Sequence, residues 1–317
     1  MFINFLSQSI RFSAVFLYGS TGETLVEKSG HLNLGIPGIM SVSAAAACIA
    51  EYYLIQSMGT NSPFLLVLLG ILVAFATGAL MGLLYSFLTV SLKCNQNVVG
   101  LAMTTFGVGL AGYNIAAMKE KLYLISRASI FFRKLFDYDK GSDFQKLFFS
   151  YGILVYLAII IAVVVQIVLS KTRVGLSLRA VGENPATADA AGINVTKYRY
   201  LATCIGCGIS GIGGLFCIMD YMGGSWEYML EALGWLAVSL VIFTVWKPAL
   251  SILGSILFAC LYRAGSYVNG ISLAEMELFK MLPYVVTIIV LIATSIFDSK
   301  NAQPPQSLGL NYFREDR

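Results

Sequence analysis

Two cysteines three residues apart, Cys204 and Cys207, form the C-x-x-C pattern that elsewhere supports thiol exchange or contributes half of a zinc site. Here both lie in an apolar run that lacks the electropositive setting needed to lower a thiol pKa, and no second pair of ligands accompanies them. His31 is the only histidine, which excludes a metal site built on two histidines. We therefore favour a packing role for both thiols, with a membrane thiol oxidoreductase as the alternative.

A literal G-x-G-x-x-G pattern occurs at Gly206, Gly208 and Gly211, within the apolar string CIGCGISGIGGLF. A dinucleotide site needs a strand before these glycines and a polar phosphate environment after them, and neither is present. We expect the small residues to allow close helix packing instead, as we do for Gly78 and Gly82. The sequence also lacks the phosphate loop G-x-x-x-x-G-K-[ST], so we expect no ATP hydrolysis, no enzymatic activity and no bound cofactor on this chain.

The polar string TRVGLSLRAVGENPATADAAGINVTKYRY, residues 172–200, separates two apolar runs. Within it Asn184 is suited to cap a helix whose first residue is Pro185, and Gly192 supplies a left-handed stop. A helix of about two turns is too short to persist alone in water. The sequence therefore predicts a short helix that needs a docking surface, flanked by Arg179 and Glu183 as candidate charged contacts. The alternative is an ordinary solvated turn between two spans.

The composition indicates an all-α polytopic membrane protein. Of 317 residues, 57% are hydrophobic and 12% are charged, against about a quarter charged in soluble domains. The excess of 21 Lys and Arg over 17 Asp and Glu is too small to indicate nucleic acid as the main partner. Runs of about 20 apolar residues predict about nine transmembrane helices, within a range of eight to ten. They lie at 9–26, 34–54, 63–91, 97–118, 150–169, 200–219, 229–246, 248–268 and 281–297.

Nine spans place the two termini on opposite sides of the membrane. The positive-inside rule then predicts a cytoplasmic C-terminus, with the loop at 172–199 and the tail at 298–317 also cytoplasmic. The basic loop at 119–149 fits this orientation badly, although long segments cross regardless of charge. Four spans, one linking span and four more would give the inverted repeat of many transporters.

Polar residues within apolar spans are costly in lipid, so they should face protein, water or a transported ligand. Asn33, with Gly35 and Gly38 near it, suggests an interrupted helix of the kind that lines a transport path. An interhelical hydrogen bond is the alternative for each Asn, and an aromatic belt at the membrane surface is the alternative for Trp226. The candidates for the substrate path are Glu23, Asn33, Asn97, Asn114, Trp226 and Glu227.

Three strings carry a resemblance to a known family. LRAVGENPATADAAGINV resembles the cytoplasmic coupling loop of ABC importer permeases, in the branch that serves nucleosides, simple sugars and branched-chain amino acids. GETLVEKSGHLNLGIPGIM, residues 22–40, is similar to the GE, ERSG, NLG and EGMM pattern of that branch, except that Lys28 replaces the usual Arg and Pro37 stands where Glu is common. WKP at 246–248 and MLPYVVTIIVLI at 281–292 resemble the later spans of the nucleoside-type members.

The resemblance implies a single transmembrane permease domain over residues 1–317, with a fold like that of the vitamin B12 importer. It implies a multi-pass protein of the bacterial cell membrane that works by alternating access with a separate ATPase, which binds ATP and Mg. A second related permease and an external substrate-binding lipoprotein are the other implied partners. The residues implied to couple to the ATPase are Arg179, Glu183, Asn184, Pro185, Ala186, Asp189 and Gly192.

The substrate that the resemblance favours is a nucleoside, whose flat base stacks on aromatic rings and whose ribose hydroxyls form hydrogen bonds. A permease for ribose, galactose or another simple sugar remains the nearest alternative. An ion-coupled secondary transporter is a further alternative, weakened because no span carries a convincing pair of opposed ionisable groups.

Overall fold

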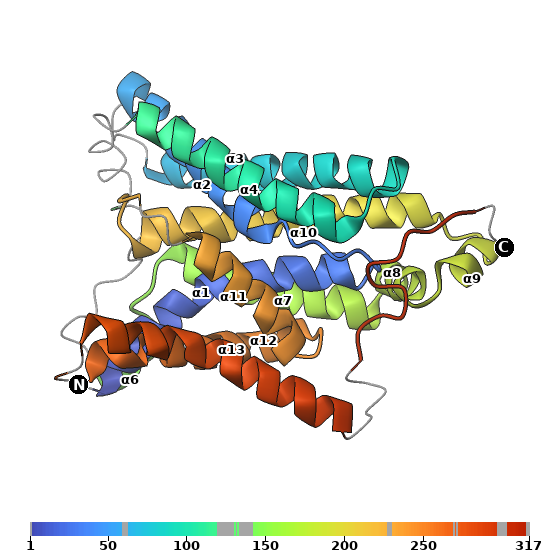
Figure 1. Cartoon of the computed structure of the whole chain (residues 1–317). Helices are drawn as coiled ribbons and strands as arrows, with labels where there is room; N and C mark the ends of the chain where they lie inside the picture. Colours follow the sequence, from blue (N-terminus) through green and yellow to red (C-terminus); the bar gives the residue numbers. More distant parts are fainter. Residues whose placement is uncertain are drawn as a thin grey trace.

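The computed structural model describes residues 2–58, 63–118, 130, 132, 142–226, 230–268, 270, 272–296 and 303–314. The described chain is helical and contains no strand (Figure 1). Its first half contains α1 (Phe2–Glu27), α2 (Ile36–Met58), α3 (Pro63–Ser86) with the π-helical turn η1 (Phe87–Ser91), α4 (Gln96–Ala117), α6 (Asp143–Phe148) and α7 (Ile153–Lys171). Its second half contains α8 (Arg173–Glu183), α9 (Pro185–Ala190), α10 (Val195–Leu215) with the π-helical turn η3 (Phe216–Tyr221), α11 (Leu230–Phe243), α12 (Pro248–Arg263) with the 3₁₀ turn η4 (Ala264–Tyr267), and α13 (Leu273–Ile296).

Seven helical segments of the described chain are long and apolar enough to cross a membrane. They are Ile36–Ser57, Phe64–Ser91, Gln96–Ala117, Ile153–Lys171, Val195–Tyr221, Pro248–Tyr267 and Ala274–Ala293. Two of the nine predicted spans fall short of this standard. The first, α1, has the length but carries too many polar side chains, and α11 is apolar but has only 14 residues.

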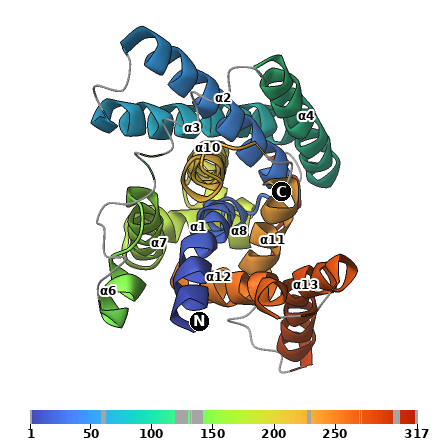
Figure 2. The same ribbon diagram turned by 90° about the vertical axis from the view of Figure 1, so that its left-hand side faces the viewer.

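The polarity of α1 is explained by its position. Figure 2 looks along the bundle and shows α1 and α10 near the centre, with α3, α4, α7 and α13 around them. α1 packs against α7, α10, α11 and α12, and its residues from Phe12 to Glu27 are buried without exception. By contrast, only 11% of the span in α13 is buried. A helix enclosed by protein need not be apolar, whereas the outer helices present side chains that suit lipid.

Close helix packing through glycine, predicted from the sequence, is confirmed. A Cβ atom on Gly206 of α10 would lie 2.5 Å from the carbonyl oxygen of Gly22 in α1. A Cβ atom on Gly78 of α3 would lie 2.4 Å from the carbonyl oxygen of Cys207. Gly82 meets the same helix one turn further along, at Thr203. The G-x-G-x-x-G pattern thus lets α1 and α3 approach the backbone of α10.

The interruption of a helix near Asn33, predicted from the sequence, is wrong. α1 ends at Glu27, Asn33 lies in the turn that follows, and α2 runs without a break from Ile36 past Gly38. Gly38 is required for packing, because a Cβ atom there would lie 2.3 Å from the carbonyl oxygen of Met103 in α4. Gly38 therefore marks a contact between α2 and α4, and it does not interrupt α2.

The helical bundle has two ends, which carry different connections. The end that we name the tail end carries residues 28–35, 92–95, 172–194, 244–247 and the tail segment 303–314, and lies at the right of Figure 1. The opposite end carries the start of α1, α6, η3 and η4. There the Arg11 guanidinium of α1 forms an ion pair with Asp220 of η3, with 2.7 Å between Nε and Oδ1. The pair joins two different helices at the end of the bundle, so the prediction that no single span carries a pair of opposed ionisable groups is not affected by it.

Candidate functional site

The short helix predicted after Asn184 is present as α9. Asn184 ends α8 and caps α9, accepting a hydrogen bond from the backbone N–H of Thr187 at 3.0 Å on its Oδ1. Pro185 occupies the first helical position, and Gly192 follows the helix with φ of +81°. A short helix leaves backbone N–H and C=O groups at its ends without partners. The Asn184 side chain satisfies one N–H, Pro185 lacks one, and Gly192 allows the left-handed turn that ends the helix.

α9 is held against the bundle by one buried side chain. Ala188 is 3% exposed and packs with Val181 of α8 and Val195 of α10 in a small apolar cluster. The other side of the helix faces outward, with Glu183, Asn184, Ala186 and Gly192 exposed. The cluster stabilises a helix too short to persist alone, and leaves a helical surface free to bind another molecule.

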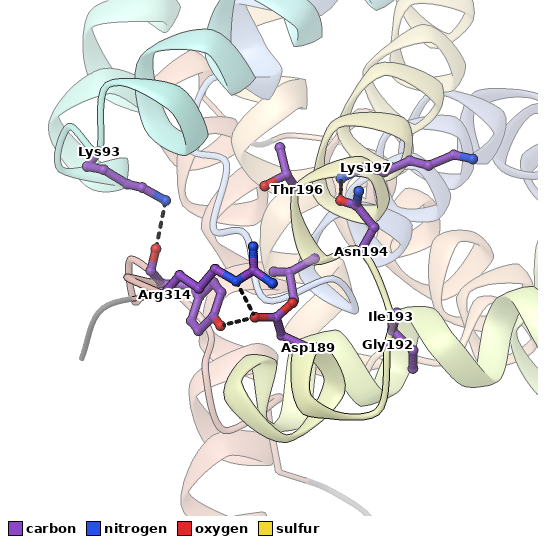
Figure 3. A pocket seen from close by; sticks show the side chains of 10 residues that line it. Lys93, Asp189, Gly192, Ile193, Asn194, Thr196, Lys197 and Arg314 are labelled. Carbon is purple, nitrogen blue, oxygen red and sulfur yellow. Dashed lines mark hydrogen bonds and ion pairs between the residues drawn. The ribbon is translucent and has the colours of Figure 1, made fainter. Parts of the chain in front are cut away.

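The tail segment 303–314 lies beside α9. Asp189 of α9 accepts a hydrogen bond from the Tyr312 hydroxyl at 2.8 Å, and the same Oδ2 atom is 3.2 Å from Nε of Arg314 (Figure 3). Between α9 and the tail is an open groove of about 580 Å³. It is lined by Lys93, Asp189, Tyr312, Arg314 and residues 192–197.

A second groove, of about 550 Å³, lies on another side of α8 and includes Arg179, Glu183, Lys28 and Lys247 in its lining. Burial lowers the pKa of Lys28, and the neighbouring Glu183 carboxylate opposes that shift. The Lys28 ammonium lies 5.9 Å from the centre of the Trp246 ring, a cation–π distance. The groove is therefore basic, with one acidic side chain.

Two residues that line the second groove have a strained backbone. Val245 and Trp246 have φ of +54° and +53°, in the left-handed region that β-branched and bulky residues avoid. The Trp246 indole N–H donates a hydrogen bond to the buried Glu27 carboxylate, which fixes the turn to the end of α1. This contact ties the α11–α12 connection to the central helix, and nothing in the local sequence signals it.

The structure brings together two of the candidate path residues. The backbone N–H of Asn33 donates to Oε1 of Glu23 at 3.1 Å, and both side chains are fully buried. The Asn33 amide also donates to the Cys207 thiol, whose sulfur is 3.3 Å away. The Glu23 carboxyl also shares a side-chain hydrogen bond with the Glu27 carboxyl, one turn further along α1. The Glu23–Asn33 pair lies between α1, the turn before α2, and α10.

The remaining path candidates lie apart from that pair. Asn97 is exposed near the start of α4, at the tail end, and Asn114 lies towards the other end of the same helix, where its amide donates to the Leu110 carbonyl. Trp226 is half-buried after η3, and Glu227 lies outside the described residues. The five candidates among the described residues therefore do not line one site.

Cys204 and Cys207 lie one turn apart on α10, and all six cysteines are free thiols. Cys207 is fully buried beside Gly82, where a Cβ atom on the glycine would lie 3.0 Å from the Cys207 sulfur. Burial against a glycine and the hydrogen bond from Asn33 give this thiol a packing role, as predicted.

The seven long apolar helices are those of a multi-pass membrane protein. The chain belongs to the family described as the branched-chain amino acid transport system / permease component, whose model matches residues 5–291. This result confirms the family resemblance inferred from the coupling-loop string. Relatives of this chain are named as permease proteins of ABC transporters.

Three relatives cover most of this chain. The nucleoside ABC transporter permease protein NupC of Lactococcus lactis is 30% identical over 307 residues, which is 96% of this chain and 94% of the relative. The guanosine ABC transporter permease protein NupQ of Bacillus subtilis is 28% identical over 319 residues, covering 96% and 95%. The putative glucose ABC transporter permease protein TsgC13 of Haloferax volcanii is 30% identical over 277 residues, covering 85% and 79%.

Proposed function

We propose that this chain is the permease subunit of an ATP-driven importer of nucleosides, and that a separate ATPase binds its α8–α9 surface. The observation that carries the proposal is α9, a capped helix that is exposed on one side and held to the bundle by Ala188. Two relatives named as nucleoside and guanosine permeases, each covering 96% of this chain, support the choice of substrate. ATP and Mg belong to the ATPase in this proposal, and this chain hydrolyses nothing.

The tail end faces the cytoplasm in this proposal. Support comes from the basic residues, which gather at that end, as the positive-inside rule requires of the cytoplasmic side. In the described chain these are Lys28, Lys93, Lys171, Arg173, Arg179, Lys197, Arg199, Lys247 and Arg314. The coupling loop and the C-terminal tail are then cytoplasmic, and an external binding lipoprotein delivers substrate to the opposite end.

We include α1 and α11 among the spans, which gives nine. α1 has 26 residues and a length of about 39 Å, enough to cross a bilayer as an interior helix. α11 is about 21 Å long and packs on α1 and α2, so that protein covers part of its surface. The inverted repeat and the likeness to the vitamin B12 importer also belong to the proposal.

Substrate moves by alternating access along a path shared with a second, related permease. The buried Glu23–Asn33 pair supports a path beside α1, because a carboxylate and an amide are suited to ribose hydroxyls. The dispersal of the other candidates over both ends of one chain favours a path that two chains complete.

The test is uptake by vesicles that contain this permease, its partner permease, the ATPase and the binding lipoprotein. We expect labelled nucleoside to accumulate only with ATP, and unlabelled nucleosides to compete. Absence of ATP-dependent uptake of any solute would overturn the proposal. Uptake driven by an ion gradient without ATP would point to a secondary transporter.

A sugar importer is the second candidate, favoured by the 30% identity with the glucose permease relative. Free ribose, galactose and glucose in the same competition experiment separate the two. If a free sugar competes and nucleosides do not, the substrate assignment is wrong while the permease assignment stands. Full uptake by a variant with both Cys204→Ala and Cys207→Ala would exclude the thiol oxidoreductase.

A further inference from the structure

The tail segment 303–314 is fastened first to α8 and to the turn after α1. The backbone N–H of Ser307 donates to the carbonyl of Gly182 at 3.0 Å, and Gly309 N–H donates to the carbonyl of Gly30 at 3.2 Å. Ser307 as a whole residue is 6% exposed. These backbone contacts place the tail across α8 and the turn after α1, which are far apart in sequence.

The same segment is also fastened to the connection between α3 and α4. The Asn311 amide donates to the carbonyl of Lys93, with 2.7 Å between nitrogen and oxygen, and the Lys93 ammonium donates to the carbonyl of Tyr312 at 2.7 Å. Gln96 Nε2 reaches the Leu310 carbonyl at 3.4 Å. The reciprocal Asn311–Lys93–Tyr312 contacts set the position of the residues that follow along the tail.

The end of the described tail completes the open groove beside α9. Tyr312 and Arg314 reach Asp189 across the groove, and Figure 3 shows both contacts together with the hydrogen bond from Lys93. The other wall is formed by residues 192–197. The tail therefore belongs to the same surface as the coupling helix.

The groove has an excess of positive charge. Its lining contains the cations Lys93, Lys197 and Arg314, and one carboxylate, Asp189, that already accepts from Tyr312 and Arg314. The Arg314 side chain is 77% exposed and the Lys197 residue is exposed. Burial and the nearby Arg199 guanidinium lower the pKa of Lys93, as expected where cations crowd together. An occupant with carboxylates would complement this charge.

We propose that the tail segment forms one wall of the ATPase-binding surface, and that the groove between it and residues 189–197 receives an acidic segment of the ATPase. The proposal rests on the proposed function, since it assigns a second element to the docking of the same ATPase. It adds Lys197 and Arg314 as the contacts that recognise carboxylates, and it makes the tail move together with α9.

The experiment measures the affinity of the purified ATPase for the assembled permease in nanodiscs of phosphatidylcholine. We compare wild type with Lys197→Glu and Arg314→Glu. Reversing either charge puts a carboxylate where the acidic segment binds, so the dissociation constant should rise about tenfold for each. The affinity should fall less steeply with salt in each variant than in wild type.

Lys171→Glu is the matched control. It makes the same change of charge at the same end of the bundle, on an exposed residue outside the lining of the groove. The control should bind the ATPase with wild-type affinity. A wild-type thermal midpoint for each variant excludes loss of folding, and a Glu→Lys change in the ATPase that restores binding to Arg314→Glu would identify the acidic partner residue.

The two proposals fail in different ways. If the wild-type permease binds the ATPase and both charge reversals bind it equally well, the groove is not the contact and the inference is overturned, while the proposed function stands. If the wild-type permease binds no ATPase, both are overturned. If the reversals reduce binding only when phosphatidylglycerol is added to the nanodiscs, the groove serves a lipid headgroup and the inference is again overturned.

Discussion

Replacing Gly182 with Ala tests how α8 is held against the membrane body. A Cβ atom at this position would lie 2.3 Å from the carbonyl oxygen of Lys28 and 3.2 Å from the backbone nitrogen of Gly30. Since real Cβ contacts essentially never fall below 3.0 Å, α8 and the turn after α1 must separate by about 0.7 Å. Both partners are backbone atoms, so no side chain can rotate away. Overpacking of this kind costs about 1–3 kcal/mol.

Two measurements check this expectation. The midpoint of thermal unfolding of the purified permease should fall, and uptake per ATP hydrolysed should decrease because the Gly182 carbonyl also accepts the hydrogen bond from Ser307. Gly109→Ala is the control, since Gly109 lies exposed in α4 with nothing within 4 Å of an added Cβ atom. That change should be neutral, or stabilising by up to about 1 kcal/mol. Equal midpoints and equal coupling in both variants would refute the close approach of α8 to the turn.

Three further changes probe the same end of the molecule. Tyr312→Phe removes the hydroxyl bonded to Asp189 and should lower uptake per ATP hydrolysed at an unchanged thermal midpoint; unchanged coupling would contradict a tail that moves with α9. Val245→Asn places a residue that tolerates positive φ at +54° and should raise stability by about 1 kcal/mol in chemical unfolding, whereas a loss would show that the strain is compensated by packing. His31 is fully buried, and burial lowers its pKa, so the unfolded chain binds the proton more readily and stability should fall as the pH drops below about 6.5, by up to about 1.4 kcal/mol per unit. The midpoint should therefore drop less between pH 7.5 and 5.5 in His31→Gln than in wild type, and equal drops would count against the assignment.

The sequence predicts α9 well because its signals are local. Asn184, Pro185 and Gly192 each act on backbone groups within a few residues, and the structure uses each as expected. The glycines that pack α1, α3 and α10 were also predicted, since a small side chain in an apolar run has few other uses. The same logic failed at Gly38, where the pattern was interpreted as a break in a helix and the structure has a helix contact.

The tail and the charged contacts of α1 could not be predicted in the same way. The tail binds by hydrogen bonds to backbone carbonyls, such as those of Gly30 and Gly182, which every residue type provides equally. Arg11 and Asp220 are 209 residues apart, and no local pattern relates them. The spans were predicted from apolarity, which measures how well a helix suits contact with lipid. The central helix α1 is too polar to meet that standard, because its neighbours are protein, and only the packing of the bundle shows this.

The enclosed position of α1 constrains how the protein is made. Synthesis delivers this helix well before the residues that pair with its charged side chains, because Asp220 follows Arg11 by 209 residues and Trp246, the hydrogen-bond donor to Glu27, follows it by 219. A nascent chain that stops short of α10 has a guanidinium and carboxylates without their native neighbours, in a helix too polar to rest in lipid. The insertion machinery must therefore retain α1, or leave it in contact with water, until the second half of the chain arrives to surround it.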